Sequence, residues 1–317
     1  MLYDSLVDYY FENDRSKLVQ TSIDTYKLPY EMKRNLLVNC IYGVDKDFNA
    51  VEACKFGLLL KLLEDEDVNS LSSFHPILPD LSNNIFYGNS LLSTADVPAD
   101  DAFEINPFDF GDRTFDLIVG NPPYMKTEDI KAFTPKEKSL YEKGNRYTSA
   151  YKQYDKYFLF IERALNLLKP DGYLGYVVPN KFMKVGAAKE LRNFIANNAY
   201  LKTMISFGAH QVFADKSTYT CIIVLEKNKH ENFKYSEVSD FIGWRVRNVN
   251  AYKFCDRPSV TINADTWILC TDEHLPLLNA VTAHTKPLGD IVGDDYIFNG
   301  IQTSANKIYV FVPISET

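Results

Sequence analysis

The residues best suited to chemistry are four in a row, Asn121-Pro122-Pro123-Tyr124. Consecutive prolines fix two backbone φ angles and remove two N–H donors, and they keep the preceding residue out of the helical region. The segment is therefore a rigid turn that presents an amide side chain, backbone carbonyl groups and an aromatic ring. Acceptors beside a stacking ring suit a planar base with an exocyclic amino group. The alternative is a plain turn, because prolines commonly mark strand ends.

An apolar run comes directly before this turn and is typical of a buried strand. Its sequence is Phe-Asp-Leu-Ile-Val-Gly, residues 115–120,. The turn thus follows the carboxyl end of a strand, which is where open α/β sheets bind ligands. This position favours a functional turn over a plain one.

The rest of the chain alternates between strand-like and helix-like patterns. Short β-rich runs predict strands, and apolar residues at helical spacing predict helices. One predicted strand ends at Asp45, and the others cover 85–91, 115–119, 173–178, 201–207 and 220–227. The predicted helices cover 49–63, 155–168 and 187–195. Such alternation predicts an α/β fold with a doubly wound, mostly parallel sheet. The short connection between the last two strands favours an antiparallel edge strand. Residues 125–154 are polar and predict a loop-rich insert.

Several motifs, in order, resemble those of the amino-methyltransferases that act on DNA bases. The signature of that family is Asp/Asn/Ser-Pro-Pro-Tyr/Phe/Trp, and the Asn form resembles the adenine-N6 enzymes more than the cytosine-N4 enzymes. The resemblance extends over most of residues 35–230. It implies a Rossmann-like class I fold that uses S-adenosyl-L-methionine and methylates adenine N6 in double-stranded DNA. Cytosine-N4 stays open as the target, and RNA or protein glutamine is a less favoured substrate.

The resemblance also implies roles for the residues around the target base. Asn121 and the Pro122 carbonyl would accept hydrogen bonds from the amino group, Pro123 would help fix the turn, and Tyr124 would stack on the base. Phe213, in a later motif, would supply a second stacking face, although an aromatic residue at a strand–loop junction is more often in the core. The lone His210 in the same loop has no visible catalytic partner and is not assigned a role.

Two short motifs resemble the family's contacts to the cofactor. In Gly43-Val44-Asp45, the carboxylate would bind the ribose hydroxyl groups, as acids at strand tips do in other nucleotide-binding folds,. The alternative is that Asp45 caps the helix that begins near Asn49. In Gly88-Asn89-Ser90, Asn89 would contact the adenine of the cofactor. Many family members have Asp there, and an ordinary turn is the alternative.

The family's glycine-rich cofactor turn is missing from this sequence. No Gly-x-Gly pair occurs in the chain, and residues 1–42 contain no glycine. Glycine permits the close backbone approach that such a turn needs. We therefore expect a methyltransferase domain without its N-terminal cofactor motif, supplied by further sequence or by a separate polypeptide. The alternative function is an inactive fragment or split subunit that binds DNA or a partner chain.

The patterning changes after about residue 230, which divides the chain into two predicted parts. Residues 1–230 are the methyltransferase domain, and 231–317 are a linker and the beginning of a target-recognition-like domain that includes Phe298–Thr303. This order resembles the methyltransferase portion of type IIG restriction–modification enzymes.

Charge, apolar stretches and cysteine spacing indicate which binding partners and which cellular compartment to expect. The net charge of −8 argues mildly against nucleic acid,. However, the Lys and Arg residues of 126–156 alternate with tyrosines, which suits a nucleic-acid groove as well as a solvated surface. The tyrosines are Tyr141, Tyr147, Tyr151 and Tyr154. No apolar stretch approaches the ~20 residues of a membrane span. The five cysteines lack C-x-x-C spacing, which favours reduced thiols in a cytoplasmic protein, and no cluster has metal-ligand spacing,.

Overall fold

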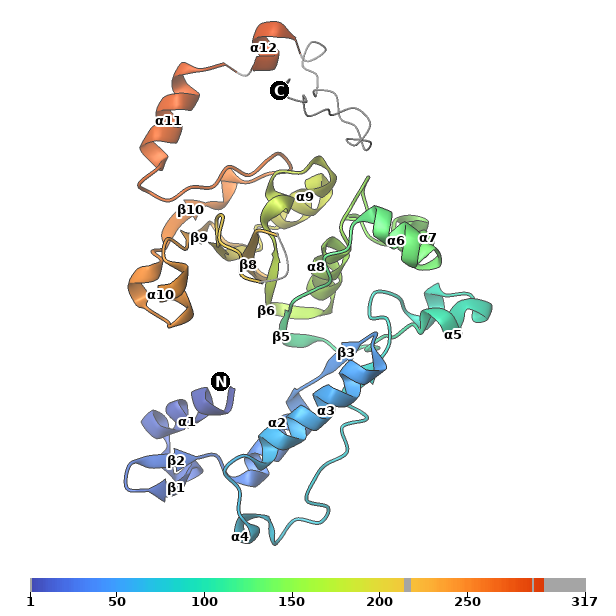
Figure 1. Cartoon of the computed structure of the whole chain (residues 1–317), viewed down its shortest axis with the longest axis vertical. Coiled ribbons are helices and arrows are strands. Elements are labelled where there is room, and N and C mark those ends of the chain that lie inside the picture. The colour runs from blue at the N-terminus through green and yellow to red at the C-terminus, as the bar shows by residue number, and fades with distance from the viewer. Residues whose placement is uncertain (1, 214–217, 287, 294–317) are drawn as a thin grey trace, which may run out of the picture.

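Helices and strands alternate along the chain in the computed structural model, which describes residues 2–213, 218–286 and 288–293 (Figure 1). The strands are β1 (Val19–Ser22), β2 (Thr25–Lys27), β3 (Gly43–Asp45), β4 (Ile85–Tyr87), β5 (Phe115–Gly120), β6 (Leu168–Pro179), β7 (Leu201–Ser206), β8 (Thr220–Glu226), β9 (Asn232–Glu237) and β10 (Cys255–Pro258). The helices are α1 (Leu2–Asn13), α2 (Tyr30–Cys40), α3 (Phe48–Leu63), α4 (Val68–Leu71), α5 (Ala102–Ile105), α6 (Thr127–Phe133), α7 (Pro135–Glu142), α8 (Lys156–Leu167), α9 (Lys189–Asn197), α10 (Phe241–Arg245), α11 (Leu275–His284) and α12 (Leu288–Val292).

The main sheet has six strands in the order β10-β9-β7-β8-β6-β5. β5, β6, β7 and β9 run in one direction, whereas β8 and β10 run in the other. This confirms the predicted α/β fold with a mostly parallel sheet. The antiparallel strand was expected at an edge, and that expectation is wrong for β8. It lies between β6 and β7, so both of its backbone edges are paired.

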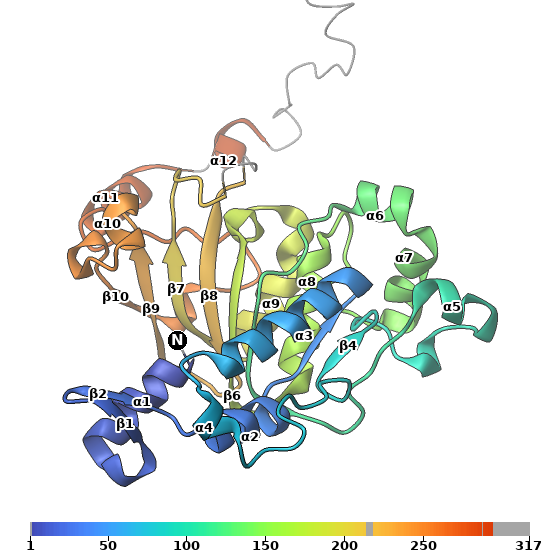
Figure 2. The ribbon, with the colours of Figure 1, turned by 60° about the horizontal axis from the view of Figure 1, so that its bottom comes forward.

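The pair formed by β3 and β4 is parallel and stands apart from the main sheet. In Figure 1, β3 lies with α2 and α3 below β5, and Figure 2 shows β4 beside α3. Within the described ranges, β3 pairs with β4 alone and β5 with β6 alone. The apolar side chains of Leu117 and Val119 on β5 are 60% and 70% exposed. β5 is therefore an open edge with an apolar face.

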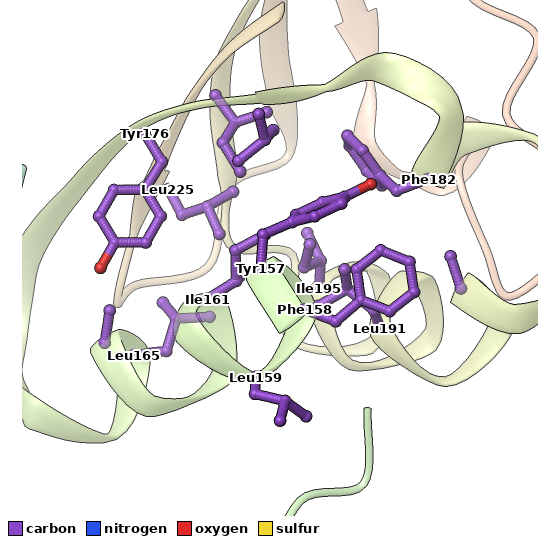
Figure 3. Close-up of a cluster of buried hydrophobic side chains, with 14 of the residues drawn as sticks. Tyr157, Phe158, Leu159, Ile161, Leu165, Tyr176, Phe182, Leu191, Ile195 and Leu225 are labelled. Atoms are coloured by element: carbon purple, nitrogen blue, oxygen red, sulfur yellow. The ribbon is translucent and has the colours of Figure 1, made fainter. Parts of the chain in front are cut away.

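The core is built around α8, whose apolar residues recur at helical spacing and face the sheet. Figure 3 shows Tyr157, Phe158 and Ile161 of α8 packed among side chains of β6, β8 and α9. Leu191 and Ile195 of α9 close the same cluster. Burial of apolar area at about 25 cal/mol per Å² holds the helices against the sheet. This packing fixes the start of α8 relative to the end of β5.

The structure of residues 125–154 differs in two respects from what the sequence suggested. The segment is largely helical, with α6 and α7 separated by one residue, rather than loop-rich. Tyr141, Tyr147 and Tyr154 are buried in the core, so they do not line a nucleic-acid groove. Several of the basic side chains are paired with acids instead of facing a ligand. These ion pairs are Lys136 with Asp101 and Glu104, Lys138 with Glu142, Arg146 with Asp96, and Lys156 with Glu137.

The sheet continues past residue 230, where the patterning of the sequence changes. β9 pairs with β7 and β10 pairs with β9, which carries the sheet to Pro258. Farther along, the Trp267 ring packs edge-on against Phe182 with centroids 5.6 Å apart. The stretch with Phe298–Thr303, expected to begin a recognition domain, lies outside the described residues.

Two simpler expectations concern cysteines and membranes. All five cysteines are free thiols. No helix in the part of the chain that the structure describes is long and apolar enough to span a bilayer.

The open edge of β5 predicts a contrast between two Leu→Ala variants. Leu174 on β6 is 0% exposed, so Leu174→Ala should lower the free energy of unfolding by about 2–5 kcal/mol,. Leu117→Ala removes the same atoms from a mostly exposed site and should cost less than about 1 kcal/mol. Urea unfolding followed by circular dichroism measures both. Equal losses would show that the apolar face of β5 is covered.

Candidate functional site

The Asn-Pro-Pro-Tyr turn directly follows β5, at the sheet edge where β6, β7 and β9 also end. Asn121 and Pro123 are exposed, Pro122 is buried, and Tyr124 is half-buried. The turn is anchored through Pro122 while the amide of Asn121 faces outward. This arrangement leaves hydrogen-bond acceptors accessible beside an aromatic ring.

Tyr124 is held by β6 and α8. Its hydroxyl donates a hydrogen bond to the Val177 carbonyl at 3.1 Å, and its ring meets Tyr157 edge-on with centroids 6.1 Å apart. Burial raises the pKa of Tyr124 to about 12, so the hydroxyl stays protonated at neutral pH and keeps donating. The ring orientation is thus set by contacts on two neighbouring elements.

The segment after the turn is tied to the start of α8. The Lys156 N–H donates to the Met125 carbonyl at 2.8 Å, and the Thr127 hydroxyl donates to the Tyr154 carbonyl at 2.6 Å. The buried Asp155 carboxylate pairs with Lys181, which follows β6, at 2.7 Å. The turn is therefore fixed on both sides by elements of the core.

Asp45 lies at the carboxyl tip of β3, as predicted, and is exposed. Its Oδ1 accepts a hydrogen bond from the Asp47 N–H at 2.7 Å, and its Oδ2 has no hydrogen-bond partner among the described residues. The helix cap is Asp47, whose side chain accepts from the Asn49 N–H at 2.8 Å. Asp45 therefore does not cap α3, and one of its carboxylate oxygens is available to a ligand.

Asn89 follows β4 and is buried. Its Oδ1 accepts from the Leu91 N–H at 3.1 Å, and its Nδ2 donates to the Tyr141 hydroxyl at 3.4 Å. Close packing explains the glycine before it, because a Cβ on Gly88 would lie 2.5 Å from the Cβ of Phe108. The Asn89 side chain is thus held in one place beside the Asp45 strand.

Phe213 and His210 lie in the segment that follows β7. Phe213 is half-buried, next to residues 214–217, which are outside the described part of the chain. It makes no ring contact with Tyr124 within that part. The His210 ring stacks on Phe241, with centroids 5.7 Å apart and 15° between the planes, so His210 packs against α10.

One cavity lies beside the predicted cofactor residues. It has a volume of about 220 Å³ and is lined by Lys46, Glu104, Ile105, Phe133, Thr134, Lys136 and Glu137. Pockets for whole drug-sized ligands measure about 300–1,000 Å³. This one therefore matches only part of a nucleoside cofactor. A larger, open hollow of about 430 Å³ runs along α2 and contains none of the predicted residues.

Three charged residues near this cavity were not predicted as site residues: Glu137 and Lys156 are buried, and Lys46 is exposed. Glu137 of α7 pairs with Lys46, the residue after Asp45, and with Lys156. The spacing of Glu137, Leu140 and Tyr141 places them on one face of a helix and could have indicated this cluster,. However, the surrounding lysines made the segment resemble a solvent-exposed one. No group of His, Cys, Asp and Glu that could hold a metal ion occurs in the ranges that the structure covers.

Comparisons with known proteins give one consistent result. Residues 39–213 match the family described as Eco57I restriction-modification methylase. The chain is 50% identical over 316 residues to the type II restriction enzyme and methyltransferase RM.Eco57I of Escherichia coli, covering 99% of this chain and 31% of that protein. It is 27% identical to the type II methyltransferase M.BstVI of Geobacillus stearothermophilus, over 63% of this chain and 38% of that protein.

A solved structure of the type IIG restriction endonuclease BpuSI aligns with a TM-score of 0.40 and 14% identity, over 81% of this chain and 33% of that one. The chain spans only 31% and 38% of the length of the two curated relatives. The family match covers more than half of the chain, and RM.Eco57I aligns along nearly all of it. The chain therefore belongs to the Eco57I restriction-modification methylase family.

Proposed function

We propose that this chain is the catalytic part of a site-specific DNA adenine-N6 methyltransferase of a restriction–modification system. The observation that carries the proposal is the Asn121–Tyr124 turn, with its exposed amide beside a ring that β6 and α8 hold in place. Family membership supports the methyltransferase class. The relatives are named as a type II restriction enzyme and methyltransferase and a type II methyltransferase, and we take double-stranded DNA as the proposed partner.

The turn acts on an adenine that has left the duplex. Unstacking a base costs about a few kcal/mol, and only a flipped base can reach the turn. Asn121 Oδ1 and the Pro122 carbonyl accept hydrogen bonds from the N6 amino group, and Tyr124 stacks on the ring. These acceptors keep electron density on the nitrogen and orient its lone pair. Phe213 covers the opposite face of the base. Positioning and a fixed electrostatic environment carry the catalysis, without a covalent enzyme intermediate.

S-adenosyl-L-methionine supplies the methyl group when it is bound. The unpaired Oδ2 of Asp45 suits the ribose hydroxyl groups, because an acid at a strand tip can accept two hydrogen bonds there,. Asn89, whose buried amide is held by Leu91 and Tyr141, is the proposed contact to the adenine, and the cavity next to Lys46 provides space for part of the nucleoside. These residues fit the cofactor's adenosine half.

We also propose that a glycine-rich turn from polypeptide outside residues 1–317 completes the cofactor site. Two observations support it: the sequence has no Gly-x-Gly pair, and among the described residues one edge of β5 is unpaired, with Leu117 and Val119 exposed. The same observations favour the second candidate function, a split or inactive subunit that binds DNA or a partner chain. We place the recognition-like part beyond β10, because β10 still belongs to the main sheet.

Asn121→Ala should lower methyl transfer at least about 100-fold, because loss of one preorganised polar group at a reacting centre has effects of that size. The assay measures the incorporation of labelled methyl groups into DNA. It is run with residues 1–317 alone and with the chain extended by whatever the adjoining coding sequence encodes. Asn39→Ala, on the exposed face of α2, is the matched control and should retain activity. Retained transfer by Asn121→Ala contradicts the mechanism. Inactivity of both unmutated forms favours the split-subunit function.

Asp45 and Asp47 provide a second, paired test. Asp45→Ala should weaken S-adenosyl-L-methionine binding about 10- to 100-fold, because it removes hydrogen bonds to a charged group. Asp47→Ala removes the cap of α3 and should cost about 1 kcal/mol of stability with little change in affinity,. Isothermal titration calorimetry and thermal unfolding distinguish the two effects. An Asp45→Ala variant with unchanged affinity would remove Asp45 from the site.

A further inference from the structure

A buried polar cluster centres on Glu137 of α7. Its Oε1 accepts a hydrogen bond from the Lys46 ammonium group. Its Oε2 accepts from the Tyr141 hydroxyl at 2.8 Å and from the Lys156 ammonium group at 3.2 Å. The Tyr141 hydroxyl in turn accepts from Asn89 Nδ2 at 3.4 Å. Glu137, Tyr141, Lys156 and Asn89 are all buried, so the contacts among them are shielded from water, whereas the Lys46 side chain is 41% exposed.

The charges of the cluster hold one another in place. Burial lowers the pKa of Lys156. Burial alone would raise the pKa of Glu137, but Lys156 and Lys46 lower it overall, so the carboxylate stays ionised at neutral pH. Burial, together with the Glu137 charge, raises the pKa of Tyr141 far above its usual range, so the tyrosine always has a proton to donate. A buried charge without its partner is strongly unfavourable. The Glu137 carboxylate therefore has one defined position.

The cluster joins three segments that are distant in sequence. Lys46 directly follows Asp45 at the tip of β3, and Asn89 follows β4. Lys156 begins α8, and its backbone N–H holds Met125 next to the Asn-Pro-Pro-Tyr turn. Glu137 thus connects both predicted cofactor contacts with the segment that carries the predicted base contacts.

Stability alone does not account for this arrangement. A buried ionic cluster is often no more stabilising than apolar side chains of similar volume. By contrast, a fully paired cluster fixes geometry, and the geometry fixed here is that of Asn89 and the tip of β3. The rim of the 220 Å³ cavity includes both Lys46 and Glu137, so the cluster forms one wall of the space beside Asp45.

We propose that Glu137 and Tyr141 are positioning residues, which hold Asn89 and Lys46 in the geometry needed to bind the adenosyl group of the methyl donor. The inference rests on the proposed function, since it assigns the cofactor's adenosine to Asp45 and Asn89. Neither positioning residue touches the reacting atoms. Their effect is on cofactor affinity rather than on the methyl-transfer step.

Tyr141→Phe is the mildest test, because it removes the bridging hydroxyl and leaves the ion pairs of Glu137 intact. We expect its affinity for S-adenosyl-L-methionine, measured by calorimetry, to fall about 2- to 10-fold, as for one lost hydrogen bond. Glu137→Gln should lower affinity further, and its midpoint of thermal unfolding should fall because Lys156 loses its charge partner. The matched control is Tyr235→Phe on β9, which also removes a buried hydroxyl near a carboxylate, at 3.5 Å from Glu237. It should bind the cofactor like the unmutated chain.

A cofactor-independent readout separates this inference from the proposed function. The side-chain amide signal of Asn89 in the nitrogen–proton NMR spectrum should shift in Tyr141→Phe and stay in place in Tyr235→Phe. A shifted signal with reduced affinity supports the inference. An unshifted signal, or unchanged affinity in Tyr141→Phe, overturns it. If the unmutated chain binds no S-adenosyl-L-methionine, the proposed cofactor site fails. The inference then falls with it, and the Asn89 signal reports only whether Tyr141 holds the Asn89 side chain in place.

Discussion

The site depends on the parallel pairing of β5 with β6. This pairing places Gly120 opposite Tyr176, one residue before the Val177 carbonyl that accepts the Tyr124 hydroxyl. A Cβ on Gly120 would lie 3.1 Å from Cε1 of Tyr176, so a small residue lets the two strands approach closely where the turn begins. The prolines then restrict the backbone to a narrow range. A one-residue change of register would move both the ring of Tyr124 and the amide of Asn121.

The two halves of the site differ in how they are held. The proposed base-binding half is a stiff turn in which Asn121 is exposed and Pro122 is buried in the packing beneath it. The proposed cofactor half relies on the ion pairs and hydrogen bonds of the buried Glu137, which links Lys46, Lys156 and, through Tyr141, Asn89. Both halves meet at the start of α8, where Lys156 bonds to Met125 through its backbone and to Glu137 through its side chain. Lys156 therefore links the position of the turn to the position of Glu137.

Local patterns were sufficient for part of this structure. The strand before Asn121, the helix α8 and the acid at the tip of β3 could be predicted, because apolar spacing and turn residues act over a few neighbours. The placement of β8 between β6 and β7 could not, because strand order depends on long-range packing. Glu137 was missed for a related reason. A glutamate in a lysine-rich segment resembles a solvated residue, and only the fold shows that it is buried together with Tyr141 and Lys156.

The chemical identity of the modified base distinguishes an adenine-binding turn from the alternatives. DNA is incubated with the protein and with S-adenosyl-L-methionine whose methyl group carries deuterium. The protein is the chain extended by whatever the adjoining coding sequence encodes. The DNA is then digested to nucleosides and analysed by mass spectrometry. If the turn binds adenine, the product is deuterated N6-methyladenine, and it is lost when Tyr124 is replaced by Ala. Deuterated N4-methylcytosine, or a labelled methyl group on protein in place of DNA, would contradict the assignment of an adenine-binding turn.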